Sequence, residues 1–500
     1  MKIQTFLEHH GISRNPFAQE DAQSDPVFNK TFCIESIHHP TWDKVYGDPS
    51  EPSTAILFGE KGAGKTALRL QIDRHLRHYN DHHPQHRVFV IHYDDFNPFL
   101  DRFREAVGGW KRRNTRRLLQ EWKLWDHMDA ILAVGVTQFV NEVLGEQRVP
   151  TDEASSPRPL KPFDRFAARD LLLLTALYDQ STAETKKGRW NRLRAKLNFH
   201  TWKAYWQFAL GCIWPPLVII TIIVMMVNGM TDSLKPLWLW FVIALAGWLP
   251  WLWRTVRTYW LSWKIERHTR TGNHAIGALQ QILASFTPTE LAAQPFPNRD
   301  RTDDRYELLG KFQRLLEQQN YTGIVVLVDR VDEPHLINGT SELMKLLIWP
   351  LLDNKFLKHP GMGLKMMLPL ELAEYTKRET PEFYQRARLD KQHVVSSFSW
   401  SGEALYDVTN ARIAACAVEG RHPRLRDLFD ATVSDDRLIE AMRSLGVPRR
   451  LFKLLHHVLV VHCNAYTDDA PQWKISSHTF ETSLAVMLQN AGPDRQVAAI

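Results

Sequence analysis

A glycine-rich segment near the amino terminus has the spacing of a phosphate-binding loop. Residues 59–66 read GEKGAGKT, which matches the pattern GxxxxGK[ST]. Its glycines would let backbone N–H groups wrap phosphate oxygens, Lys65 would neutralise their charge, and the Thr66 hydroxyl would bind Mg²⁺. The expected nucleotide-binding residues of this segment are Gly59, Glu60, Lys61, Gly62, Ala63, Gly64, Lys65, Thr66 and Ala67.

The residues on either side of this loop have the patterns needed to position it. Residues 53–58, STAILF, predict a short buried strand, and residues 67–76, ALRLQIDRHL, have helical periodicity. A strand, a loop and a helix in this order present the positive end of the helix dipole to a phosphate group. A chance glycine-rich turn would need neither flanking element, so we expect a nucleotide site here.

Carboxylates follow a second apolar run. Residues 324–328, IVVLV, predict a buried strand that ends at Asp329. We expect Asp329 to hold Mg²⁺ through water, and Glu333, or Asp332 if its geometry is better, to polarise an attacking water molecule. The alternative is that these acids only cap the next turn. The expected catalytic residues are Glu333, Asp332 and Lys65, and the expected metal-binding residues are Thr66 and Asp329.

A further nucleotide-binding candidate lies in the carboxy-terminal part of the chain. Residues 446–455, GVPRRLFKLL, place Arg449 at a helix start, because proline is favoured in the first turn of a helix. From a lid over the glycine-rich loop, this guanidinium would reach the γ-phosphate of a nucleotide. A solvated arginine at a helix start is an equally good interpretation.

Other patterns predict the elements that must carry these residues. Residues 87–92, 363–368 and 392–398 read as three more strands, and a helix start follows the first of them at residues 94–98. Five strands with helical connections predict an α/β fold, a three-layer P-loop domain with a parallel sheet. Amphipathic stretches within residues 401–500 predict a helical lid domain. Because the chain lacks a guanine-reading NKxD motif, ATP is the expected nucleotide.

Two long uncharged runs interrupt this domain. Residues 204–231 contain no Asp, Glu, Lys or Arg over 28 residues, and residues 236–253 contain none over 18 residues. About 20 apolar residues span a bilayer core of about 30 Å, so both runs predict transmembrane helices. Tryptophans gather toward the ends of the runs, as they do at membrane interfaces. The rival interpretation is a buried helical hairpin in a soluble core.

Basic residues flank this hairpin on both sides. The chain has a net charge of +6, but residues 186–203 and 254–270 together carry +11, so the rest carries −5. The positive-inside rule places both flanks and the bulk of the protein in the cytoplasm, and the loop at 228–235 on the other side of the bilayer. Nucleic-acid binding by the basic residues is an open alternative. The side chains expected along the lipid headgroups are Arg189, Arg192, Arg194 and Lys196.

Composition excludes several other classes of protein. Hydrophobic residues make up 44% and charged residues 24% of the chain, which is ordinary for a folded protein and excludes wholesale disorder. The four cysteines form no CxxC pair, which argues against a zinc site and a disulfide framework. Five hundred residues are too many for one compact core, so we expect several domains.

With both nucleotide motifs placed, the chain resembles the signal-transduction branch of the AAA+-related P-loop ATPases. Residues 329–333, DRVDE, are similar to the DGxDE motif of the NACHT-type (STAND) members, and transmembrane helices between the two motifs are typical of the KAP ATPases. The KAP proteins usually show DDxDR, whereas this chain has Arg330 second and Glu333 last. Residues 11–17, GISRNPF, are similar to the segment that borders adenine in related ATPases.

This resemblance implies an ATP-dependent switch on the cytoplasmic face of a bacterial inner membrane, in stress or antiphage defence. We expect ATP and Mg²⁺ as cofactors, and as partners the lipid bilayer, further copies of the chain and a protein encoded by a neighbouring gene. The alternative function is a nucleotide-binding, membrane-tethered scaffold with little turnover. A transporter or channel is disfavoured, because neither span contains an ionisable residue.

These predictions divide the chain into successive parts. The expected parts are an amino-terminal segment that borders the nucleotide site (1–50), the first part of the P-loop core (51–135), a helical insert (136–185), basic juxtamembrane helices with the transmembrane hairpin (186–270), the second part of the core (271–400) and the carboxy-terminal helical lid (401–500).

Overall fold

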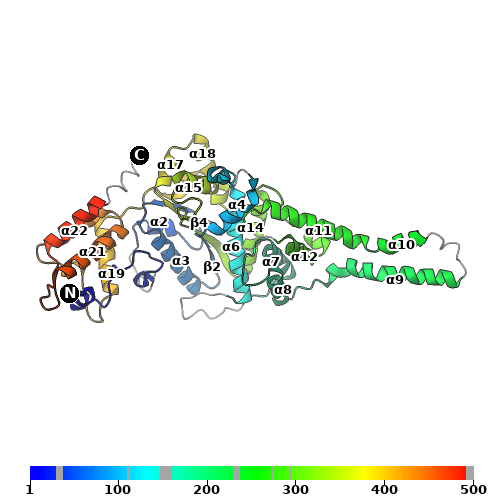
Figure 1. Ribbon diagram of the computed structural model, residues 1–500, viewed down its shortest axis with the longest axis horizontal. Coiled ribbons are helices and arrows are strands. Elements are labelled where there is room, and N and C mark those ends of the chain that lie inside the picture. The colour runs from blue at the N-terminus through cyan, green and yellow to red at the C-terminus, as the bar shows by residue number, and fades with distance from the viewer. Residues whose placement is uncertain are drawn as a thin grey trace. The chain divides into compact units, whose positions relative to one another are not determined.

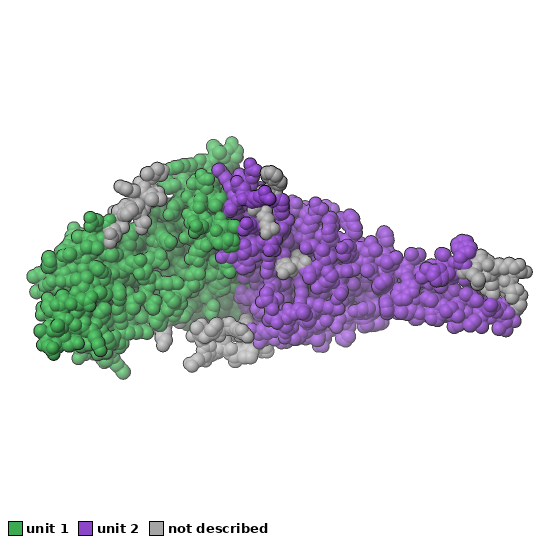
Figure 2. Space-filling view, in the orientation of Figure 1, with its two compact units in different colours: residues 1–95, 322–500 green, residues 96–321 purple. Residues whose placement is uncertain are grey.

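The computed structural model describes residues 1–29, 38–109, 113–146, 160–228, 237–272, 275–292 and 294–490. The chain forms two compact units, which Figure 2 shows in different colours. Unit 1 comprises residues 1–95 and 322–500, and unit 2 comprises residues 96–321. The expected boundaries at 135 and 271 both fall inside unit 2.

Unit 1 is built on a parallel five-stranded sheet with the strand order β2-β3-β4-β1-β5. The strands are β1 (Ala55–Gly59), β2 (Arg87–Tyr93), β3 (Tyr321–Val328), β4 (Met362–Pro369) and β5 (His393–Val395). All five predicted strands are therefore confirmed. The last strand is shorter than predicted, although the Phe398 backbone N–H still donates to the Phe58 carbonyl at 2.7 Å.

The order of the strands brings the two sequence motifs to the same edge of the sheet. β1 and β4 are buried along their whole lengths, as strands of a parallel sheet are when both faces are covered. β4 lies between β1 and β3, with Phe58 opposite Leu368 and Val328 opposite Met366. Because these strands run parallel, the loop after β1 and the carboxylates after β3 leave the sheet at its carboxyl edge, where ligands bind in open α/β sheets.

Helices complete unit 1, and Figure 1 labels most of them. Their bounds are α1 (Ile3–His9), α2 (Trp42–Tyr46), α3 (Lys65–His82), α15 (Ser341–Ile348), α16 (Asn354–Leu357), α17 (Glu371–Lys377), α18 (Pro381–Ala387), α19 (Gly402–Ala415), α20 (Asp435–Leu445), α21 (Pro448–Ala465) and α22 (Ser477–Asn490), with short 3-10 turns at Trp349–Leu351, Leu389–Lys391 and Leu425–Leu428.

The carboxy-terminal region is helical, as predicted, and shares a core with the amino-terminal end. Phe6 of α1 is fully buried in one apolar cluster with Leu405 of α19 and Leu455 of α21. The predicted amphipathic stretch breaks at Gly446, whose φ of 74° is the left-handed conformation that ends many helices. Pro448 then starts α21, so the candidate Arg449 lies in the first turn of that helix.

Unit 2 is helical in its described part. Its helices are α4 (Asn97–Val107), α5 (Thr115–Gln120), α6 (Leu124–Leu144), α7 (Arg165–Tyr178), α8 (Lys186–Lys196), α9 (Trp206–Val227), α10 (Leu237–Ala246), α11 (Leu249–His268), α12 (Ile276–Leu283), α13 (Pro288–Leu291) and α14 (Asp303–Gln318), with a 3-10 turn at Trp202–Tyr205.

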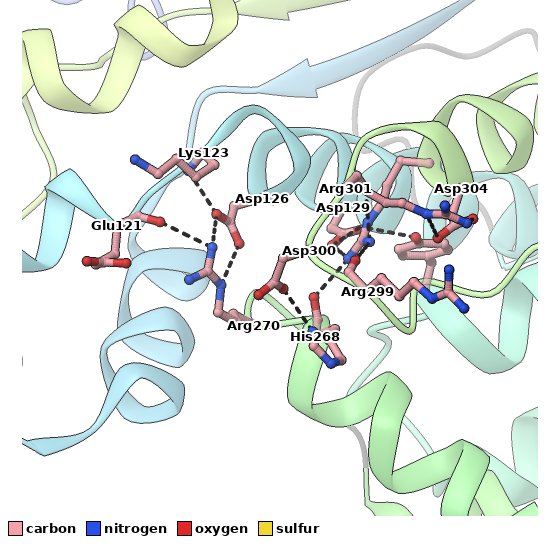
Figure 3. A network of polar contacts seen from close by, with 12 residues as sticks. Glu121, Lys123, Asp126, Asp129, His268, Arg270, Arg299, Asp300, Arg301 and Asp304 are labelled. Atoms are coloured by element: carbon pink, nitrogen blue, oxygen red, sulfur yellow. Dashed lines mark hydrogen bonds and ion pairs between the residues drawn. The ribbon is translucent and has the colours of Figure 1, made fainter.

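Buried ion pairs hold several of these helices together (Figure 3). Arg305 of α14 and Asp129 of α6 are both fully buried, with 3.0 Å between Nη2 and Oδ2, and the Tyr178 hydroxyl of α7 donates to the same carboxylate at 2.8 Å. Arg270, which follows α11, donates to both oxygens of Asp126 at 2.6 and 3.1 Å. Three helices and the end of α11 are therefore joined through charges that have little contact with water.

The predicted membrane hairpin is helical. The described residues contain one helix that is long and apolar enough to cross a membrane, Trp206–Val227, with a mean hydropathy of 2.4 and only 11% of its apolar window buried. There are two candidates if the pair Trp238–Ala246 and Leu249–His268, bent by 52°, counts as one span. Figure 1 shows α9 and α10 running alongside each other. The predicted loop at residues 229–235 and the start of the second run at 236 lie outside the described residues.

The structure corrects the expected placement of Arg189 along lipid headgroups. Its side chain is only 1% exposed, and it donates to Asp179 Oδ2 at 2.8 Å and to Asn141 Oδ1 at 2.5 Å. Arg192 is more exposed, at 45%, but it is paired with Glu146. Arg189 lies on the buried face of α8 with Trp190 and Leu193, where a charge needs a partner. Arg189 therefore stabilises the helices rather than binding a membrane.

Candidate nucleotide-binding site

The glycine-rich loop joins β1 to α3 through a tightly curved backbone. Gly62 and Gly64 have φ values of 86° and 98°, a region in which any other residue would be strained. A Cβ added at Gly62 would also lie 2.8 Å from Cβ of Arg449, so α21 approaches closer here than a side chain allows. Backbone shape and this close approach together explain why the loop needs glycine at these positions.

Lys65, the first residue of α3, closes the loop from within. Its Nζ donates to the carbonyls of Gly59 at 2.7 Å and Glu60 at 3.0 Å. Burial lowers the pKa of Lys65, while the nearby carboxylates of Asp332 and Asp329 oppose the shift. The ammonium group therefore lies inside the curve of the loop, where the phosphate groups of a nucleotide would also lie.

Thr66 and Asp329 bring the two sequence motifs into direct contact. The Thr66 hydroxyl donates to Asp329 Oδ2 at 2.9 Å, and Asp329 is only 2% exposed. Burial raises the pKa of Asp329, opposed by the charge of Arg69 and by the hydrogen bond from Thr66. A hydroxyl and a carboxylate at the same point are oxygen ligands of the kind that Mg²⁺ takes in nucleotide sites, so this pair fits the ion.

An arginine that we did not predict completes this contact. Arg69, one turn along α3, is 3% exposed, and its Nε lies 3.3 Å from Asp329 Oδ2. Its guanidinium also pairs with Asp94, which follows β2. Arg69 therefore contacts the same Asp329 oxygen as Thr66, while Asp94, expected at a helix start, balances its charge. The sequence gives no signal for this role, because the buried face of α3 also holds the polar residues Gln71 and Asp73.

The carboxylates after β3 lie on a tight turn. Arg330 has a φ of 59°, in the left-handed region, and its carbonyl accepts a hydrogen bond from the Glu333 backbone N–H at 3.2 Å. Glu333 is exposed over 57% of its side chain and lies 3.7 Å from Arg330. Burial of the rest of its side chain raises the pKa of Glu333. The positive charge of Arg330 opposes this shift, and the negative charges of Asp332 and Asp329 add to it. Asp332 is the less exposed of the two base candidates.

The carboxy-terminal helical region contacts the glycine-rich loop directly. The Trp400 indole N–H donates to the Ala63 carbonyl at 2.8 Å, and the Arg449 backbone N–H donates to the Gly62 carbonyl at 3.3 Å. Arg449 Nε is buried and has no hydrogen-bond partner among the described residues. Arg450 contacts a different residue of the loop, since its Nη1 lies 3.7 Å from Glu60 Oε2. An unsatisfied buried donor beside the loop is the feature that an anionic ligand would satisfy.

These parts surround one pocket of about 290 Å³ within unit 1. The predicted residues that line it are Lys61, Gly62, Gly64, Lys65, Thr66, Ala67, Asp329, Asp332, Glu333 and Arg449. The other three predicted residues, Gly59, Glu60 and Ala63, accept hydrogen bonds from Lys65 or Trp400 through their carbonyls. The structure therefore gathers the predicted residues around a single cavity.

The amino-terminal segment reaches this pocket with residues later than those expected. Residues 11–17 were expected to border adenine, but Phe17 packs against Phe452 instead, with ring centroids 6.1 Å apart. The segment lines the pocket through residues between Gln19 and Phe28. Arg412 of α19 fixes this path, because its guanidinium donates to the Pro16 carbonyl at 2.7 Å.

The chain matches no protein-family model, and neither the curated proteins nor the solved structures contain a match for it. The fold is an α/β arrangement with a parallel five-stranded sheet and a glycine-rich loop at the carboxyl edge of that sheet. It also has one or two apolar helices in mid-chain that could cross a membrane, and a helical carboxy-terminal region.

Proposed function

We propose that this chain is a membrane-anchored, Mg²⁺-dependent P-loop ATPase that acts as an ATP-dependent switch. The observation that carries the proposal is the contact between Thr66 Oγ1 and Asp329 Oδ2 at 2.9 Å, beside a loop closed around Lys65. These two motifs are 263 residues apart in the chain, and the second alone is a weaker signal than the first. A chance glycine-rich turn has no reason to meet a buried carboxylate at the end of another strand.

The residues have distinct roles in this proposal. Backbone N–H groups of the loop and Lys65 hold the phosphate groups, and the unpaired Nε of Arg449 is available to the γ-phosphate. Mg²⁺ held by Thr66 and Asp329 would supply positive charge at the phosphate oxygens. Glu333 or Asp332 would accept the proton of the attacking water, and the raised pKa of Glu333 suits a general base.

Substitution of the two base candidates tests turnover. In the full-length chain, Glu333→Gln should keep ATP binding but lower the rate of ATP hydrolysis by about a hundredfold or more, because a positioned base contributes on that order. Asp332→Asn is the matched variant and should change the rate much less. Phosphate release from both variants, together with their ATP affinities, separates the roles. A large loss in Asp332→Asn alone would assign the base to Asp332.

A scaffold with little turnover is the second candidate function, and one observation favours it. The Glu333 side chain is 57% exposed, and its ion pair with Arg330, at 3.7 Å, holds it weakly. A base that is not held in position would hydrolyse ATP slowly. If the wild-type chain binds ATP with Mg²⁺ but both variants and the wild type release phosphate equally slowly, the scaffold is the better account.

The setting of this activity is part of the proposal. The apolar helix Trp206–Val227 supports a membrane anchor, with the bulk of the chain on the cytoplasmic face of a bacterial inner membrane. The similarity of residues 329–333 to the NACHT-type motif, and the interruption of the domain by the hairpin as in KAP ATPases, support a role in stress or antiphage defence. Such a switch would act as a homo-oligomer and through a protein encoded nearby.

A further inference from the structure

Helix α11 carries an aromatic face that extends well beyond the predicted membrane span. The face consists of the exposed residues Leu249, Leu252, Trp253, Val256, Tyr259, Trp260 and Trp263. At about 100° per residue, these positions fall within an arc of about 120°, so they form one continuous stripe along the helix. The predicted span ended at Trp253, yet Trp260 is still 56% exposed. Four of the seven residues of the stripe therefore lie outside the uncharged run.

The opposite face of α11 shows that this exposure is not a by-product of a generally apolar helix. The residues that α11 buries are Thr258, Ser262 and Ile265. Two of these three are small and polar, with the Ser262 hydroxyl donating to the Thr258 carbonyl at 2.9 Å. A helix of a soluble protein turns its apolar face inward. In α11 most of the large apolar side chains point outward instead, with Ile265 and Trp251 among the exceptions, which calls for an apolar environment on that side.

Cations line the edge of the aromatic face. Lys264 Nζ lies 4.9 Å from the ring centre of Trp260, and Arg267 Cζ lies 5.3 Å from the ring centre of Trp263. Arg257, on the same side of the helix, is exposed. The helix holds a single acid, Glu266, which is half-buried. Aromatic rings with Lys and Arg beside them are the composition of the layer between lipid tails and headgroups.

The bend before α11 keeps this face near the bilayer. Trp263 lies about 15 Å along the helix axis from Trp253, at about 1.5 Å per residue. If α10 lies along the bilayer normal, the 52° bend between α10 and α11 tilts α11 by the same angle. Trp263 is then only about 9 Å farther from the bilayer centre than Trp253. The headgroup layer is about 5–8 Å deep, so the large indole of Trp263 still reaches it.

We propose that the aromatic face of α11 is a membrane-surface site that lies in the headgroup layer, with Lys264 and Arg267 selecting anionic lipids. This inference rests on the membrane anchor in the proposed function and goes beyond it, because it concerns residues 256–267, which lie beyond the two uncharged runs. A second copy of the chain is the rival occupant. The cations beside the rings favour lipid, since a self-complementary contact would bring like charges together.

Photo-crosslinking in proteoliposomes tests this proposal on the full-length chain. p-Benzoylphenylalanine replaces Trp260 or Trp263, and the vesicles contain phosphatidylcholine alone or with phosphatidylglycerol. We expect adducts with lipid at both positions, several-fold more abundant with phosphatidylglycerol at equal lipid content. The double variant Lys264→Gln and Arg267→Gln should retain the adducts but lose this preference, because the two charges that an anionic surface attracts are gone.

Two control positions separate this inference from the anchor itself. The same reagent at Ile220 of α9, which is 55% exposed, should label lipid in both kinds of vesicle, and at Tyr384 of unit 1 it should label none. Lipid adducts at Ile220 without adducts at Trp260 and Trp263 would overturn the inference and leave the anchor intact. Adducts of Trp260 or Trp263 with a second copy would make the face an interface between chains. An absence of lipid adducts at Ile220 would refute the anchor and this inference together.

Discussion

Asp329 is a buried carboxylate of the pocket that two side chains hold in place. It accepts a hydrogen bond from Thr66 and lies 3.3 Å from Arg69, and burial raises its pKa against both of these partners. The sequence predicts Asp329 because an acid ends an apolar run, but it does not predict Arg69. Ion pairs between distant segments follow no period, and an arginine in a helix reads as a solvated residue until its partners are known.

Arg449 gives a prediction at the scale of single residues. Its Nε is buried without a partner, so Arg449→Ala should weaken ATP by about tenfold to a hundredfold, the value of a charge-assisted hydrogen bond of about 1.5–3 kcal/mol. The affinity for ADP, which has no γ-phosphate, should fall much less. Calorimetry with both nucleotides measures the difference.

Arg450→Ala is the matched control for this prediction. Arg450 lies beside Arg449 on α21, but its Nη1 is 3.7 Å from Glu60 and 3.5 Å from the Leu445 carbonyl. Its loss should therefore affect ATP and ADP alike, and only mildly. Equal losses of ATP and ADP in Arg449→Ala would show that Arg449 supports the loop and does not sense the γ-phosphate.

At the scale of elements, the sequence predicts all five strands, but it does not predict the full length of α11 as one helix. Runs such as residues 324–328 contain nothing but β-branched and apolar residues, which a covered parallel strand requires. The sequence predicts basic juxtamembrane helices within residues 186–270, but not that one helix runs from the second uncharged run to His268, because charges at Arg254 and Arg257 stop an uncharged run without stopping a helix. Charge content sets where a predicted span ends, whereas backbone propensity sets where a helix ends. Here the predicted span ends at Trp253 and α11 ends at His268, fifteen residues later.

The packing of α6 gives a prediction about pH. Burial raises the pKa of Asp126 to about 7, opposed by Arg270, whereas an unfolded aspartate has a pKa of about 3.9. Between these values the folded form binds more protons than the unfolded form, so the free energy of unfolding of unit 2 should fall as pH rises from about 4 to about 7.

Amide hydrogen exchange of α6 measures this dependence on the full-length chain, after correction for the intrinsic exchange rate at each pH. Protection should be greater at about pH 5 than at about pH 8, and Asp126→Asn should flatten the difference. Glu307→Gln, which removes an exposed carboxyl from α14, should leave it unchanged. A pH dependence that survives in Asp126→Asn would assign it to another buried group.

At the scale of the whole molecule, the hairpin is a closed insertion into unit 2. Arg254 joins its two ends, because its guanidinium donates to the carbonyl of Ala204 and, at 2.6 Å, to those of Ala284 and Phe286. Replacing residues 206–252 by a short flexible linker should therefore leave a folded chain that carbonate extracts from membranes, because the aromatic face of α11 alone binds a bilayer only reversibly. The full-length chain should sediment with membranes and resist carbonate extraction. Recovery of the full-length chain in the soluble fraction would contradict the anchor.

The division into units was less predictable than the hairpin. Residues 96–135 read as part of the core, since they continue directly from the second predicted strand, yet they belong to unit 2. The reason is visible only in three dimensions. Arg305 and Asp129 are 176 residues apart in the chain, and their buried pair ties α6 to α14. Local patterns fix elements, whereas such distant pairs decide which elements pack together.

The central claim is that Lys65 and its loop hold the phosphate groups of ATP. Calorimetry of the full-length chain with ATP and Mg²⁺ tests it most directly, with Lys377→Ala as the control, because Lys377 is an exposed lysine of the same unit, 64% exposed. The wild type and Lys377→Ala should bind ATP equally, and Lys65→Ala should weaken it by at least about tenfold, since the phosphate groups lose a charge-assisted partner. Equal ATP binding by wild type and Lys65→Ala, or none by the wild type, would contradict the account.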